Sequence, residues 1–172
     1  MEKKKSSHIA KGLVIALLLI VLDVVASFAG IKLQPWFRWI PTILMAVSFI
    51  IACIVYSNEM DNRVTFGNVF GHGFKTSLVV ASIFVVYTFL SIYVIFPEQK
   101  EQIMQAQITE MEKSNMSEEQ KDQAVTMFNK MFVPIAFLAA VIGTLLVGAI
   151  ASLLGAAFAK KKPITPFDQQ TI

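Results

Sequence analysis

The sequence predicts an all-α integral membrane protein: an antiparallel bundle of four transmembrane helices, with an extracytoplasmic helical hairpin between the third and fourth helices. With 172 residues, 55% of them hydrophobic and only 16% charged, the chain is too apolar for a soluble domain of this length. Four apolar windows are each long enough for a bilayer core of about 30 Å, which needs about 20 helical residues. One long polar segment, residues 97–131, separates the last two windows.

We expect a single membrane domain, residues 1–172, that crosses the membrane at about 9–33, 39–57, 74–96 and 132–159. The first span also resembles a signal peptide, because lysines precede its apolar run. However, the run is longer than the usual signal-peptide core, it contains an aspartate, and the sequence begins with methionine. We therefore expect an uncleaved span.

The less apolar positions of the first span repeat at helical spacing. They are three, four or seven residues apart, which places them on one side of a helix. These positions are Gly12, Ala16, Asp23, Ser27 and Gly30. We expect this side to face protein, and the side rich in leucine and isoleucine to face lipid.

Tryptophan and proline mark the turn between the first two spans. Trp36 and Trp39 suit the headgroup level, because indole combines an apolar body with one polar N–H group. Pro41 follows in the predicted first helical turn, where its missing N–H is not needed. The single cysteine, Cys53, lies inside the second span, so neither an intramolecular disulfide nor a cysteine-based metal site is expected.

An aromatic and glycine-rich stretch, residues 65–75, precedes the third span. Phe66, Phe70 and Phe74 are four residues apart, which predicts a short interfacial helix with its aromatic face on the membrane. A re-entrant turn is the alternative, because the glycines weaken a helix. Within the third span, small and hydroxylated residues share one face. They are Ser77, Ala81, Thr88 and Ser91.

The polar segment predicts the helical hairpin. Residues 98–113 have a helix-forming composition, and Ser114 with Asn115 is expected to break this helix. Ser117 and Gln120 then have the spacing of a capping box, which predicts the start of a second helix. We expect the hairpin to lean on the membrane surface or on a partner.

The fourth span carries the clearest packing signal. Small residues recur every four positions, and such a stripe forms a groove that lets another helix backbone approach closely. The stripe consists of Ala136, Ala140, Thr144, Gly148, Ser152 and Ala156. We expect the fourth span to be the central helix of the bundle.

Lysines at both ends of the chain predict its orientation. Residues 3–5 and 160–162 are all lysines and lie just outside the first and last spans. Because lysine and arginine favour the cytoplasmic side, we expect both termini in the cytoplasm and residues 97–131 in the periplasm. The same lysines account for the formal net charge of +3, so no nucleic-acid partner is expected.

Four short motifs follow one another between Ile9 and Lys161. They are Thr65 to Phe74 before the third span, the Pro97-Glu98 break after it, Met116 to Gln120, and the small-residue fourth span ending in Ala156 to Lys161. In their order and spacing they resemble an uncharacterised family of bacterial inner-membrane proteins found mainly in Bacteroidetes, the domain-of-unknown-function family numbered 4199. The resemblance implies a four-span fold in a bacterial inner membrane. It implies no known reaction, substrate or site residue.

Asp23 is the strongest candidate for a functional residue, because an acidic group at membrane depth needs a polar partner or a water-filled path. Counted from Lys11 at 1.5 Å per residue, it lies about 18 Å into the bilayer. Hydroxyl side chains of other spans reach a similar depth. The predicted intramembrane polar cluster is Asp23, Ser27, Tyr87, Thr88 and Thr144.

Two interpretations of Asp23 remain open. The first is a protonated, hydroxyl-bonded aspartate that fixes the register of the helices, and the second is a group that lines a transport path. The sequence indicates no basic partner for Asp23, which favours the structural interpretation.

The remaining polar residues indicate neither a metal site nor catalysis. His8 and His72 lack companions at metal-ligand spacing, so we expect His72 to be a solvated interfacial histidine. The acidic residues of the polar segment lack a calcium-loop pattern and predict a solvated helix face. They are Glu110, Glu112, Glu118, Glu119 and Asp122. We expect no cofactor, no metal and no enzymatic activity.

Two functional hypotheses follow. The first is a non-enzymatic accessory or interaction subunit of an inner-membrane assembly, because the packing surface is organised while the chemistry is sparse. Its expected partners, besides the lipid bilayer, are another membrane protein or further copies of the chain. The alternative is a small dimeric transporter or channel that uses Asp23 within the membrane.

Overall fold

The computed structural model describes residues 6–112 and 117–162, and within these residues the chain is helical with no strand. Four helices are long and apolar enough to cross a membrane, which confirms the predicted class and the number of candidate spans. They are α1 (His8–Phe28), α2 (Ile40–Glu59), α3 (Phe66–Leu90) and α5 (Glu118–Phe158). The shorter elements are η1 (Phe37–Trp39), the π-helical turn η2 (Ser91–Ile95) and α4 (Gln99–Glu112).

The first helix is shorter than predicted, because a glycine ends it. Gly30 has a φ of 69°, a left-handed conformation that glycine adopts without steric strain. Its N–H donates to the carbonyl of Ser27, and the N–H of Ile31 donates to the carbonyl of Ala26, both at 3.1 Å. These two bonds form a Schellman motif. The span predicted to reach residue 33 therefore ends at Phe28, and Gly30 belongs to its terminus rather than to its packing face.

The predicted interfacial helix or re-entrant turn at residues 65–75 is wrong. α3 begins at Phe66, where the Thr65 hydroxyl accepts from the Asn68 N–H at 3.2 Å, and continues without interruption into the apolar span. In this stretch, close packing against other helices requires glycine at position 73. A Cβ atom at Gly73 would lie against the side chains of Cys53 and Ser152, so only glycine fits there.

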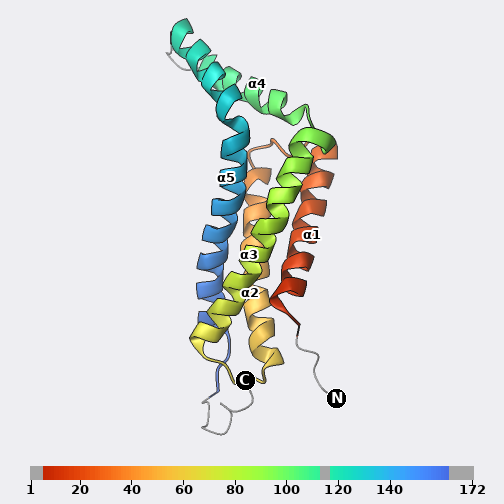
Figure 1. Ribbon diagram of the computed structural model, residues 1–172, viewed down its shortest axis with the longest axis vertical. Helices are drawn as coiled ribbons and strands as arrows, with labels where there is room; N and C mark the ends of the chain where they lie inside the picture. Colours follow the sequence, from red (N-terminus) through yellow and green to blue (C-terminus); the bar gives the residue numbers. More distant parts are fainter. Residues whose placement is uncertain (1–5, 113–116, 163–172) are drawn as a thin grey trace.

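The fourth apolar span is the second half of one long helix. Ser117 and Gln120 form the predicted capping box, and α5 then continues for 41 residues through Pro134. At 1.5 Å per residue α5 is about 60 Å long, roughly twice a bilayer core. Figure 1 shows its first part, together with α4, extending beyond the ends of α1, α2 and α3. The predicted break at Ser114 and Asn115, and the lysines at positions 3–5, lie outside the described residues.

Small residues allow the helices to pack closely. A Cβ atom at Gly148 on α5 would collide with Ser77 on α3, and one at Gly155 would lie 2.7 Å from the Cβ of Cys53 on α2. On α1, a Cβ at Gly12 would lie 2.8 Å from the Cβ of Val79. The backbones of α5 and α1 thus approach their neighbours more closely than any larger residue permits.

The predicted stripe on α5 divides into two parts. Its C-terminal members Thr144, Gly148, Ser152 and Ala156 are buried against the rest of the chain. Ala136 and Ala140 are only half-buried and border a cavity. Gly143 lies between the two parts, and a Cβ atom there would meet no atom within 4 Å. The helices are therefore in close contact toward the end of α5 and separate toward its middle.

Apolar side chains fill the inside of the bundle and cover its outside. Ala16, Phe49, Val80 and Ala151, one from each long helix, belong to one buried cluster. Large apolar side chains such as Leu146 remain exposed on the outer surface. A helix that is apolar on all sides is expected when lipid rather than water is the solvent.

We predict that Gly148→Leu lowers the free energy of unfolding by about 1 to 3 kcal/mol, because the new side chain overlaps Ser77 and cannot interdigitate. Thermal unfolding in one detergent measures the change. Leu146→Ala is the control: this side chain is 59% exposed and faces lipid, so its loss should matter far less. Equal melting temperatures for Gly148→Leu and the wild type would contradict the close contact between α3 and α5.

Candidate functional site

A cavity of about 440 Å³ lies where the small-residue contact ends. Its lining comes from α1, α2, α3, α5 and the π-helical turn η2, together with Lys32 after α1 and Gln99 at the start of α4. Most of the lining is apolar. The larger apolar side chains include Leu19, Met45, Phe84, Ile92, Phe132 and Val147. Thr42 on α2 and Ala139 on α5 line the cavity and are also exposed, so the cavity is not fully enclosed.

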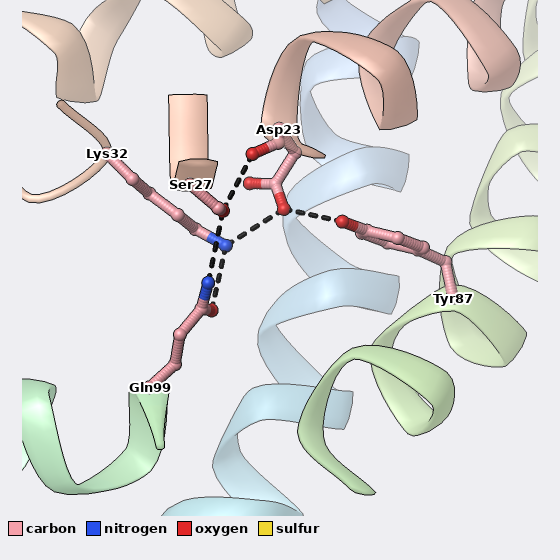
Figure 2. Close-up of polar contacts among 5 residues, drawn as sticks. All are labelled: Asp23, Ser27, Lys32, Tyr87 and Gln99. Atoms are coloured by element: carbon pink, nitrogen blue, oxygen red, sulfur yellow. Dashed lines mark hydrogen bonds and ion pairs between the residues drawn. The ribbon is translucent and has the colours of Figure 1, made fainter. Parts of the chain in front are cut away.

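The polar end of the cavity is built around Asp23. One carboxylate oxygen, Oδ2, accepts a hydrogen bond from the Tyr87 hydroxyl at 2.6 Å and from the Lys32 ammonium at 2.8 Å. Figure 2 shows these side chains converging on Asp23 from the loop after α1 and from α3. The carboxylate therefore links three separate segments of the chain.

Gln99 and Ser27 complete a ring of polar contacts (Figure 2). The Lys32 ammonium also donates to the Gln99 side-chain oxygen at 3.0 Å, and the Gln99 amide donates to the Ser27 hydroxyl at 3.0 Å. The Ser27 hydroxyl in turn donates to the backbone carbonyl of Asp23 at 2.7 Å. The first residue of α4 is thereby attached to the end of α1.

Lys32 corrects the prediction that Asp23 has no basic partner. Its ammonium forms an ion pair with the Asp23 carboxylate, so the partners of Asp23 are not hydroxyl groups alone. The sequence predicted a first span that continued to residue 33. Because α1 ends at Phe28 in the Schellman motif, the following loop turns back and brings Lys32 to the carboxylate. In the sequence, Gly30 was the one feature that could have indicated the early end of α1 and thus the position of Lys32.

The predicted polar cluster comes together in part. Asp23, Ser27 and Tyr87 are joined by hydrogen bonds, as described above. Thr88 and Thr144 line the same cavity, but neither makes a hydrogen bond to Asp23 within the described part of the chain. Sequence reasoning missed Gln99, which belongs to the polar segment and was not expected at the membrane site.

The ion pair is partly accessible. The side chains of Asp23 and Lys32 are 26% and 28% exposed, so neither is fully enclosed by protein. Leaving either charge unpaired in a bilayer would be unfavourable. The pair thus makes a polar group tolerable at this depth and still leaves part of it open to the cavity.

A second polar group lies at the opposite ends of the helices. The Lys11 ammonium contacts the Glu59 carboxylate at 2.8 Å, and the His72 ring stacks on Tyr56 with centroids 4.0 Å apart. His72 is only 9% exposed, so the expected solvated interfacial histidine is wrong. The His8 ring lies edge-on to it at 6.1 Å. α3 continues through position 72, which places this residue in the bundle and not in a surface stretch.

Within residues 6–112 and 117–162, no three histidine, cysteine, aspartate or glutamate side chains come together as a metal site. In the acidic segment Glu118 contacts Lys121 at 2.7 Å, three residues along the same helix. Such a pair is typical of a solvated helix surface.

Comparisons with known proteins identify a family without an assigned activity. The family model described as "Protein of unknown function (DUF4199)" matches residues 11–161. No curated protein and no solved structure shows a significant match to the chain. Functional reasoning for this chain therefore rests on its own geometry.

We predict that Tyr87→Phe lowers the free energy of unfolding by about 1 kcal/mol, because it removes a hydrogen bond to a charged but partly exposed acceptor. Tyr93→Phe is the matched control, since Tyr93 is 55% exposed and packs on Phe89. Thermal unfolding of both variants in one detergent gives the comparison. If the two substitutions have the same effect, the contact between Tyr87 and Asp23 does not stabilise the fold.

Proposed function

Since this chain belongs to the DUF4199 family of proteins of unknown function, we propose from the geometry of its cavity that it binds a small molecule within the bilayer and acts as a small transporter. The observation that carries this proposal is the cavity of about 440 Å³ with the Asp23–Lys32 pair at one end. Ligand sites in proteins have volumes of about 300 to 1,000 Å³ and combine apolar walls with a few convergent polar groups. This cavity has both properties.

We propose that the chain is not an enzyme. Neither histidine nor cysteine occurs among the described residues that line the cavity. The one carboxylate is engaged by Lys32 and Tyr87. This arrangement suits binding and orientation better than acid–base chemistry, and it calls for no cofactor.

A role as accessory or interaction subunit is a second candidate, and a different observation favours it. α4 and the first part of α5 extend beyond the other helices (Figure 1), and Met127 on this extension is 66% exposed. A partner membrane protein or a second copy of the chain would contact this region. The small-residue stripe no longer supports this hypothesis, because its buried half packs against α2 and α3 of the same chain.

We further propose an antiparallel bundle in a bacterial inner membrane, of Bacteroidetes as the family resemblance implies, with both termini in the cytoplasm. In this orientation the α4–α5 extension is periplasmic. Lys11 and the exposed Lys160 to Lys162 belong to the helix ends on the cytoplasmic side, in agreement with the preference of lysine for that side. Glu98 and Glu101 belong to the opposite end.

The orientation predicts the activity of reporter fusions. Alkaline phosphatase fused after Ser114 should be active, because the enzyme folds only after export, whereas fusions after Thr65 or at the C-terminus should be inactive. Activity measured in whole cells against expression level decides the outcome. The reverse pattern would invert the proposed topology.

If the cavity binds a small molecule, a large side chain placed in the cavity should prevent this binding. In Gly143→Leu the added side chain occupies free space, so the variant should fold as the wild type does but lose any small molecule that co-purifies from native membranes. Gly71→Leu is the control, since its Cβ also meets no atom within 4 Å but the residue lies outside this cavity. Mass spectrometry of solvent extracts from both variants measures the difference. Identical extracts from wild type, Gly143→Leu and Gly71→Leu would remove the case for a ligand.

Transport itself is tested by flux. In liposomes, Asp23→Asn should abolish uptake of the molecule found in the extract, because the anchoring carboxylate is lost. Unchanged uptake, or none with the wild type, would leave the interaction role as the better account. In that case a protein partner should co-purify in mild detergent and dissociate when α4 is removed.

A further inference from the structure

We infer that the molecule bound in the cavity is a neutral amphipath with a hydroxyl head and an apolar tail, an inference that rests on the proposed function. Four observations carry it: the charge balance of the polar end, the unused hydrogen-bonding groups there, the position of the apolar walls and the opening of the cavity.

The charges around the cavity cancel. Asp23 and Lys32 are the charged residues among the described residues of its lining, and they are paired at 2.8 Å. A head group with its own charge would have to separate this pair or remain without a counter-ion in a medium of low dielectric constant. A neutral polar head requires neither.

The Asp23–Lys32 pair retains one unused donor and one unused acceptor, beside further polar groups of the lining such as the hydroxyls of Thr88 and Thr144 and the second N–H of the Gln99 amide. The Lys32 ammonium has three N–H donors, of which the contacts to Asp23 and Gln99 use two. The second carboxylate oxygen of Asp23, Oδ1, accepts no hydrogen bond from a described residue, because both contacts end on Oδ2. A hydroxyl group both accepts and donates, so it satisfies both free groups. A carbonyl or ester head only accepts and would leave Oδ1 unpaired.

Part of the apolar lining lies deeper in the bundle than the polar end, while Pro41, Ile92 and Phe132 line the cavity toward the helix ends. Asp23 is five residues from the end of α1, whereas Leu19 lies one turn further into the helix. Met45 is likewise displaced from the start of α2, and Val147 lies near the middle of the apolar part of α5. A molecule with its head at Asp23 and its tail along this deeper part would point the tail toward the bilayer centre, in the orientation that an amphipath already has in a membrane.

The opening of the cavity agrees with access from lipid. Thr42 and Ala139 line the cavity and are exposed, so the lining is not sealed from its surroundings. Thr42 is the third residue of α2, so the exposed part of the lining reaches the level of the helix ends. An amphipath residing in the bilayer can enter there with its head near the headgroup layer, without passing through water.

The test uses the full chain in phosphatidylcholine nanodiscs and a dodecanol analogue that carries a photoreactive diazirine in its tail. Labelled peptides are mapped by mass spectrometry, and labelling is competed with dodecanol, dodecylamine and dodecanoate, which share one tail and differ in the head. We expect labels on the cavity walls of α2 and α5, and no such labels in Gly143→Leu. Dodecanol should compete at about tenfold lower concentration than either charged analogue, the difference expected when one buried polar group is left unpaired.

Two substitutions change the charge balance in opposite directions. Asp23→Asn leaves Lys32 without a counter-ion, so dodecanoate should become the best competitor, and Lys32→Gln should favour dodecylamine for the opposite reason. A merely structural role of the pair would not reverse the order of competitors. If a variant does not fold, the order measured with the wild type still decides.

The possible failures are distinguishable. If dodecylamine or dodecanoate competes as well as or better than dodecanol in the wild type, the inference of a neutral hydroxyl head group is wrong. The proposal that the cavity binds a ligand would remain. Labelling that is the same in Gly143→Leu and Gly71→Leu, or that maps away from the cavity walls, overturns the proposed function as well.

Discussion

The close contact of α5 with α3 and α2 determines the rest of the structure. Apolar side chains cannot drive helices together in lipid, so association depends on backbones that approach closely enough for dispersion contacts. Gly73 and Ser77 on α3 face Ser152 and Gly148 on α5, and Gly155 on α5 faces Cys53 on α2. No residue with a larger side chain fits at these glycines, so the contact defines the register of three helices.

The same contact explains where the cavity lies. Toward the end of α5 the small residues are buried against their neighbours, whereas at Gly143 no neighbouring atom is within reach of a Cβ. Beyond this point α5 continues toward α4 and the extension seen in Figure 1. The space left between the helices is bordered by the Asp23–Lys32 pair, which keeps a polar group compatible with the membrane by balancing its charge.

Local physical chemistry predicted those parts of the fold that depend on neighbouring residues in the sequence. Apolar length predicted the four candidate spans, the spacing of Ser117 and Gln120 predicted a helix start, and four-residue spacing predicted the buried position of Gly148. Asp23 was singled out because a carboxylate in an apolar run needs a partner. Each of these signals lies within one turn or one span.

The features that sequence reasoning missed depend on contacts between distant segments or on where a helix ends. The role of Lys32 depends on the end of α1 at Phe28, five residues before the predicted end of the span, and the role of Gln99 depends on the start of α4 beside the end of α1. His72 was expected to be a solvated interfacial histidine because it lacks companions at metal-ligand spacing, but it lies within the continuous helix α3 and stacks on Tyr56. Helix propensity alone does not reveal such tertiary contacts.

The central claim, that the cavity holds a molecule with its head at Asp23 and Lys32, is tested most directly by an experimental density map. The wild-type chain would be extracted from its own membrane in nanodiscs, with an antibody fragment on α4 to increase its size. The account predicts elongated non-protein density along Leu19, Met45 and Val147 that ends beside the Lys32 ammonium and the Asp23 carboxylate. A cavity closed by inward movement of α5, with Asp23 and Lys32 in contact only with protein, would contradict it.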